Sequence, residues 1–98
     1  MLRHIFIAPA FPECTEEQLS HVVARLKTMK NLVPSIRTLT VTRSEGLSGE
    51  RPGMILIADF DTVSDWESYM ADETHQEIGR EIVRFIDADK GLVTQGHI

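Results

Sequence analysis

The sequence has a single cysteine and no long hydrophobic segment, and both features narrow the classes of protein to which it can belong. Cys14 is the one cysteine among 98 residues, so the chain can form neither an internal disulfide nor a cysteine zinc cluster. It lies just before an expected helix, and we interpret it as a loop thiol. No apolar run approaches the roughly 18 residues of a membrane span, and the run near the start is too short for a secretory signal. We therefore expect a cytoplasmic protein that does not associate with membranes.

Positive charge is also scarce. Ten Lys and Arg residues stand against fifteen Asp and Glu, which gives a net charge of −5 with no basic cluster. A chain this acidic repels phosphate backbones, so nucleic-acid binding is not expected. The apolar share of 42% and the charged share of 26% are typical of one globular domain, which we place at residues 1–98. A core of this size is modest, so an oligomer would bury useful additional surface.

Apolar patterning predicts four β-strands. They are expected at residues 2–8, 35–43 and 54–60 and in the closing segment 91–98. The first and third strands are apolar on both faces, which is typical of strands that are covered on both sides.

Two helical segments separate these strands. A capping box that begins at Thr15 opens the first, whose helical spacing of apolar residues continues to residue 33. In the second segment, Thr62 is expected to cap a short helix. Thr74, with a glutamate at the third helical position, is expected to cap another helix that runs to about residue 87.

The element order β-α-β-β-α-β predicts a ferredoxin-like α+β fold, with a four-stranded antiparallel sheet and all helices on one face. Because the helices cover only one face, the apolar residues of the other face need a partner. A second copy of the same chain is the simplest one. We therefore expect a homodimer whose sheets pack face to face as a dimeric α+β barrel.

A histidine lies on the apolar face of the last helix. At about 100° per residue, His75 shares a line with Ile82, and Gly79 flanks that line one turn on. Gly79 either allows close packing or leaves space beside the imidazole. The break before Thr74 restarts the helix at a new angle, so Tyr69 and His75 can converge on one cavity.

His4 lies on the same face of the first strand as Phe6, which could be the helix-facing side. A tyrosine and two histidines around an apolar hollow match a general acid–base set. We therefore predict catalytic roles for His75, Tyr69 and His4. The predicted substrate-binding residues are Phe6, Trp66, Gly79 and Ile82.

Each of these residues also has a structural interpretation. A histidine in a first helical turn can be satisfied by water, and a strand histidine such as His4 can bond a backbone carbonyl. Tyr69 and Trp66 can be core or interface residues. The acidic residues from Asp59 to Glu67 match no metal-ligand spacing, and we interpret them as a solvated helix start, so neither a metal nor another cofactor is expected.

Three segments resemble the stress-responsive A/B barrel (Dabb) family, and together they span nearly the whole chain. They are "LRHIFI", "EEQLSHVVARLKTMKNLVPSIRTLTV" and "ADFDTVSDWESYMADETHQEI". The resemblance implies a dimeric α+β barrel, in a family whose members mostly have no established activity. One relative is the cofactor-free plant enzyme olivetolic acid cyclase; its catalytic tyrosine and histidine align with Tyr69 and His75, and a histidine of its first strand aligns with His4.

This chain departs from the family at the start of the last helix. Members commonly carry His-Pro-x-His there, whereas this chain has Asp72, Glu73 and Thr74 before His75. The acidic pair is expected to disfavour an anionic substrate.

Two functions from different classes follow. The first is a cofactor-free enzyme that moves a proton on a small apolar carbonyl compound, in cyclisation, isomerisation or lyase chemistry. This enzymatic hypothesis requires Tyr69 and His75 to line one common cavity of roughly 300 Å³ or more. The alternative is a non-catalytic stress-response or hydrophobic-ligand-binding module. A cofactor-independent monooxygenase is a third possibility, with no specific support in the sequence.

Overall fold

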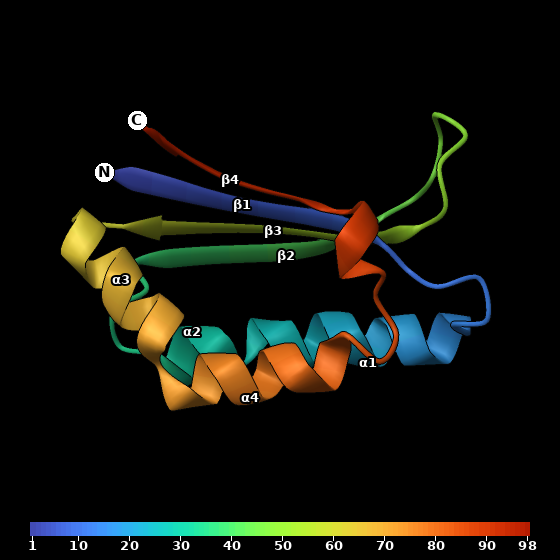
Figure 1. Cartoon of the computed structure of the whole chain (residues 1–98), viewed down its shortest axis with the longest axis horizontal. Helices are drawn as coiled ribbons and strands as arrows, with labels where there is room; N and C mark the ends of the chain where they lie inside the picture. The colour runs from blue at the N-terminus through green and yellow to red at the C-terminus, as the bar shows by residue number, and fades with distance from the viewer.

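The computed structural model describes all 98 residues, and the chain folds into one sheet covered by helices on one side. The strands are β1 (Leu2–Pro9), β2 (Thr38–Ser44), β3 (Gly53–Phe60) and β4 (Leu92–His97). The helices are α1 (Glu16–Lys27), α2 (Met29–Leu32), α3 (Val63–Ala71) and α4 (Glu73–Ile82), followed by a 3-10 turn, η1 (Ala88–Lys90). The sheet order is β2-β3-β1-β4, and all neighbouring strands are antiparallel. This confirms the ferredoxin-like α+β fold (Figure 1).

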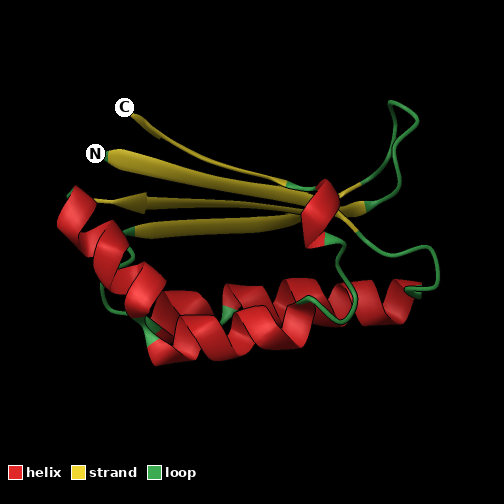
Figure 2. Cartoon of the chain, viewed as in Figure 1, coloured by secondary structure: helices red, strands yellow, loops and turns green.

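The helices lie in one layer against one face of the sheet (Figure 2), and the buried core residues come from both layers. Directly opposed residues of antiparallel strands point to the same face, so the register identifies which side chains face the helices. In β1 these are Leu2, His4, Phe6 and Ala8, of which Phe6 is partly buried and the other three are buried. The largest fully buried side chains come from β3, from the four α-helices and from the segments that follow α2 and α4: Tyr69, Phe60, Met29, Met54, Leu56, Ile78, Ile86, Val22 and Val33.

The opposite face of the sheet carries no helix, yet its centre is apolar. We call this surface the open face; its apolar residues oppose one another across β3, β1 and β4 and are Ile5, Ile7, Ile55, Ile57 and Leu92. Ile7 is 40% exposed and Leu92 is 60% exposed. Both faces of β1 and β3 are thus apolar, as their sequence patterns predict.

The first helical segment starts as predicted and is then divided. The Thr15 hydroxyl accepts a hydrogen bond from the Gln18 backbone N–H, and the Gln18 side chain accepts one from the Thr15 N–H. The single helix that the sequence predicts up to residue 33 breaks at Thr28, whose hydroxyl donates to the Arg25 carbonyl at 2.6 Å. None of the helices is both long and apolar enough to cross a membrane.

Apart from the break at Thr28, two element boundaries differ from the prediction by three residues or more. β2 begins at Thr38 rather than at residue 35, because the chain first makes a turn in which the Ile36 N–H donates to the Val33 carbonyl at 3.3 Å. α4 ends at Ile82 rather than near residue 87, because the following residues bond to the segment after β1. The Phe11 N–H donates to the Phe85 carbonyl at 2.9 Å, and Ala10 forms an isolated bridge with Ile86.

Candidate functional site

The break between α3 and α4 is built by two N-caps. The Thr62 hydroxyl caps α3, as predicted, by accepting a hydrogen bond from the Asp65 N–H at 3.1 Å. The predicted cap of α4, Thr74, is wrong: the cap is Asp72, whose carboxylate accepts a hydrogen bond from the His75 backbone N–H at 3.0 Å. Aspartate is at least as good an N-cap as threonine, and Asp72 comes first along the chain. Its extended backbone, with ψ at 129°, turns the chain between the two helices.

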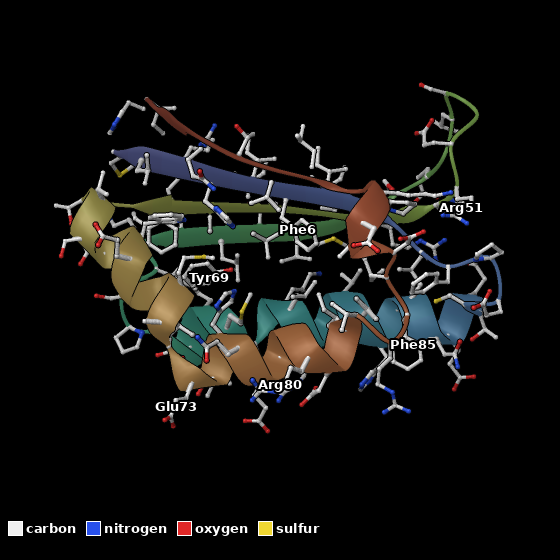
Figure 3. All side chains as sticks on the ribbon, in the orientation of Figure 1. Phe6, Arg51, Tyr69, Glu73, Arg80 and Phe85 are labelled. Carbon is white, nitrogen blue, oxygen red and sulfur yellow. The ribbon has the colours of Figure 1, made fainter.

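The rings of Tyr69 and His75 meet across this break. Their centroids are 3.9 Å apart and their planes are inclined by 35°. Tyr69 is only 2% exposed, and His75 is half-buried. Figure 3 places Tyr69 and Phe6 in the layer between the helices and the sheet. The convergence of phenol and imidazole is the geometry that the break is expected to allow.

His4 lies on the other side of Tyr69. Its ring centroid is 5.6 Å from that of Tyr69, in an edge-on arrangement, and its side chain is buried. The Trp66 indole N–H donates to His4 Nδ1 at 3.2 Å. The Gln95 side-chain nitrogen is 3.0 Å from the same atom. The two histidines and the tyrosine therefore form a row with the phenol in the middle.

Burial sets the protonation states of these three groups. Desolvation lowers the pKa of His4 to about 4, and the nearby His75 adds to this effect. Desolvation also lowers the pKa of His75, although the Met70 carbonyl, the Asp72 carboxylate and the Tyr69 carbonyl oppose the change. Desolvation raises the pKa of the Tyr69 phenol. At neutral pH both imidazoles are therefore uncharged, and the phenol keeps its proton.

His75 also has an unused polar atom. Its Nδ1 is buried and has no hydrogen-bond partner. Most buried polar atoms are paired, so an unpaired one at a ring stacked on a tyrosine calls for an explanation. The carbonyls of Met70 and Tyr69, which act to raise the pKa of this ring, are candidate acceptors for a proton on its nitrogen.

Tyr69 and His75 line one small pocket between the helices and the sheet. The pocket has a volume of about 90 Å³. Among the residues predicted to bind substrate, Phe6, Gly79 and Ile82 line it, and Trp66 does not. The remaining walls are aliphatic: Leu26, Met29, Leu56, Ile78 and Val83. An apolar pocket with one phenol and one imidazole is suited to a small, mostly apolar molecule.

Gly79 leaves open space at the wall of this pocket. A Cβ atom added at Gly79 would meet no other atom within 4 Å. Of the two roles that the sequence leaves open for Gly79, the structure therefore favours space beside the imidazole over close packing.

The pocket is smaller than the function hypothesis requires. Its volume of about 90 Å³ is below the expected roughly 300 Å³, and also below the roughly 150 Å³ of an engineered cavity that binds benzene. Larger hollows, of about 170, 220 and 410 Å³, lie elsewhere on the chain. Neither Tyr69 nor His75 lines any of them.

Two residues of the site were not predicted from the sequence patterns. Asp72 holds the His75 backbone, and its position three residues before the histidine is the signal that could have identified it as the cap. Gln95 bonds His4 from β4, and only the strand register reveals this contact. Local spacing carries no information on a pair of residues 91 positions apart.

The acidic residues near α3 prove to have different surroundings. Asp59 is not part of a solvated helix start, which corrects the prediction for this residue: it is 5% exposed and binds the Arg3 guanidinium through two hydrogen bonds of 2.9 and 3.0 Å. Asp61 pairs with Arg37 at the surface. No group of three or more His, Cys, Asp or Glu side chains is placed to hold a metal ion.

Solved structures of the same fold include a lyase and proteins of unknown function. An Arabidopsis thaliana protein is similar over 100% of this chain and 95% of its own, with 17% identity and a TM-score of 0.85. A dimeric ferredoxin-like protein of unknown function from Thermobifida fusca is 18% identical, with a TM-score of 0.84 over 99% of this chain and 90% of its own. The hydroxynitrile lyase of Passiflora edulis is 17% identical, with a TM-score of 0.82 over 99% and 92%. At these identities the similarity establishes the fold alone.

Sequence comparison gives the family. No curated protein matches this chain. The family model described as Stress responsive A/B Barrel Domain matches residues 2–90, which is nearly the whole sequence. This chain therefore belongs to the stress-responsive A/B barrel (Dabb) domain family.

Proposed function

We propose that this protein is a cofactor-free enzyme that moves a proton on a small apolar carbonyl compound, in cyclisation, isomerisation or lyase chemistry. The observation that carries the proposal is the uncharged His75 ring, stacked on Tyr69 at 3.9 Å in the wall of an apolar pocket. A protein of the same fold from Passiflora edulis is a hydroxynitrile lyase, so this fold can carry lyase chemistry.

His75 is the base in the proposed reaction. Its lowered pKa leaves it neutral at pH 7, so it can take a proton from the carbon next to the carbonyl group. The electron pair of the broken C–H bond moves toward the carbonyl oxygen, where negative charge develops. The Asp72 carboxylate beside His75 then stabilises the imidazolium. Return of the proton to another position of the substrate restores neutral His75.

Tyr69 acts as a hydrogen-bond donor in this scheme. Its raised pKa means that the phenol stays protonated and serves as a donor rather than a base. A hydrogen-bond donor aimed at the developing oxyanion lowers the activation barrier, and its effect is larger in an apolar pocket than in water. His4, on the far side of the phenol, does not line the pocket and supports Tyr69 by contact.

The pocket limits the substrate to a small molecule. A volume of about 90 Å³ admits fewer non-hydrogen atoms than benzene has. The carboxylates of Asp72 and Glu73 precede the histidine and disfavour an anionic compound. Small uncharged ketones and aldehydes fit both limits.

A non-catalytic ligand-binding or stress-response module is the second candidate. The small volume of the pocket favours it. In that case the two rings only fill the interior, and His75→Phe should be folded and at least as stable as the wild type.

We also propose that two copies pair through the open face. Its isoleucines and Leu92 form a continuous apolar surface, and burying such surface contributes about 25 cal/mol per Å². Proteins of this fold from Thermobifida fusca and Bacteroides fragilis are described as dimeric. The pairing would cover the face that no helix covers.

Exchange of α-protons in D₂O tests the enzymatic proposal without knowledge of the natural substrate. Acetone, butanone and cyclobutanone serve as probes, and ¹H NMR follows the loss of their α-proton signals. The wild type should accelerate exchange of at least one probe, and His75→Ala should reduce that acceleration by roughly 100-fold or more. His21→Ala, which changes an exposed histidine of α1, is the matched control and should leave the rate unchanged. Equal rates for the wild type and His75→Ala would remove the enzymatic proposal and leave the non-catalytic module.

A further inference from the structure

The hydrogen bonds around His4 determine which of its ring nitrogens carries a proton. Trp66 Nε1 lies 3.2 Å from His4 Nδ1, and Gln95 Nε2 lies 3.0 Å from the same atom. An indole N–H can donate a hydrogen bond but cannot accept one. His4 Nδ1 must therefore accept, and an accepting ring nitrogen has no proton.

We infer that Trp66 and Gln95 are positioning residues that hold His4 as a neutral imidazole with its proton on Nε2. In a neutral imidazole one nitrogen donates and the other accepts, so an unprotonated Nδ1 leaves the proton on Nε2. The side-chain amide of Gln95 can present either end, but the indole of Trp66 has no such freedom and fixes the assignment. With its NH₂ group toward Nδ1, Gln95 is a second donor to the same lone pair, a three-centre arrangement.

The surroundings of His4 agree with a neutral ring. The side chain is 4% exposed, and no carboxylate or cationic side chain is opposite it, since its partners across the sheet are Ala58 in β3 and Gln95 in β4. The titratable groups that face it are Tyr69 from α3 and His75 from α4. Both are uncharged at neutral pH, so nothing nearby stabilises a positive charge on His4.

This arrangement gives the two histidines different tasks, and that consequence rests on the proposed function. Only His75 lines the pocket, and it becomes positively charged when it takes a proton. A protonated His4 on the other side of Tyr69 would oppose that charge, whereas a neutral His4 does not. By keeping His4 neutral, Trp66 and Gln95 leave His75 as the single proton acceptor of the row.

The tautomer of His4 can be read directly by NMR. Long-range ¹H–¹⁵N correlation spectra of protein labelled with ¹⁵N-histidine distinguish a protonated from an unprotonated ring nitrogen. The wild type should show His4 in one neutral form, with the proton on Nε2, unchanged from pH 7 to about pH 5. A proton on Nδ1, or an even mixture of the two tautomers at pH 7, would overturn the inference. This NMR measurement does not depend on catalysis, so its outcome is independent of the exchange experiment with His75→Ala.

Variants show which residues hold the tautomer. Trp66→Phe keeps an aromatic ring but removes the donor, and combined with Gln95→Leu it should leave both tautomers populated and raise the pKa of His4. Gln95→Glu places an acceptor beside Nδ1 that competes with the Trp66 donor, so part of the His4 population should then carry a proton on Nδ1. Thr94→Val, on the neighbouring β4 residue whose side chain points to the open face, is the matched control and should change nothing. An unchanged tautomer in the double variant would assign the positioning role to other residues; should that variant not fold, Gln95→Glu and the wild-type spectrum still decide.

Discussion

Replacing Gly79 by alanine should make the protein more stable while it makes the pocket smaller. Gly79 lies in the interior of α4, where glycine costs about 0.5–1 kcal/mol relative to alanine. The added Cβ would meet no atom within 4 Å, so no steric cost offsets this gain. We therefore expect the free energy of unfolding to rise by about 0.5–1 kcal/mol. For a domain of this size, each 1 kcal/mol corresponds to a Tm increase of roughly 4–8 °C.

The same methyl group would enter a pocket of only about 90 Å³, so α-proton exchange of the ketone probes should become slower. Gly79→Leu should abolish exchange. Thermal unfolding followed by circular dichroism and exchange followed by NMR measure the two effects. Glu77→Ala, at an exposed position of the same helix, is the control; its free energy of unfolding should stay within about 0.5 kcal/mol of the wild type, with exchange unchanged. A less stable Gly79→Ala protein would show that the space is not open, and unchanged exchange would show that the reaction does not use this pocket.

Substitutions at the helix break, at the partly buried Arg3–Asp59 ion pair and on the open face supply three further tests. Asp72→Ala should lower the free energy of unfolding by about 1 kcal/mol in urea titrations, because it removes the N-cap of α4. Asp72→Asn should keep most of the cap but should lower the pKa of His75 in NMR titrations, because the negative charge is lost. Equal losses of stability in the two variants would contradict the capping role. The Arg3 guanidinium holds the pKa of Asp59 below its usual range, so the stability this pair contributes is present above about pH 4 and is lost as the pH falls through the lower, folded-state pKa. Asp59→Asn should therefore be less stable at pH 7 and less sensitive to acid below pH 4, and an acid limb identical to that of the wild type would refute this. Ile57→Arg should convert dimers to monomers in light scattering with an unchanged circular dichroism spectrum, and an unchanged mass would exclude the open face as the interface.

The fold could be predicted from the sequence because the patterns that determine its elements are local. The two apolar faces of β1 show in seven consecutive residues, and the Thr62 cap shows in four. Element boundaries were harder to predict where residues distant in the sequence form hydrogen bonds with the same backbone groups. The carbonyl of Phe85 accepts a hydrogen bond from Phe11, more than seventy residues away, so helical spacing alone overextends α4. At the start of the same helix, Asp72 and Thr74 are both good caps by type, and the choice depends on where the chain leaves α3.

The candidate site could be predicted from the sequence only in part. Helical periodicity brings His75 to the apolar face, and the break explains how Tyr69 reaches it. Pocket volume depends on how Leu26, Met29 and Val83 pack from separate helices, which no local pattern encodes. Trp66 shows the same limit: its residue type suggests a substrate platform, whereas its indole N–H bonds a histidine on the sheet.

The pH dependence of α-proton exchange tests the central claim most directly, because it reports the titration of the group that takes the proton. If His75 is the base, the catalysed rate should rise through a pKa below 6.5 and then stay level through neutral pH, since the Tyr69 phenol keeps its proton there. A rate that simply follows hydroxide concentration, at about tenfold per pH unit and with the same value in His75→Ala, would contradict the account.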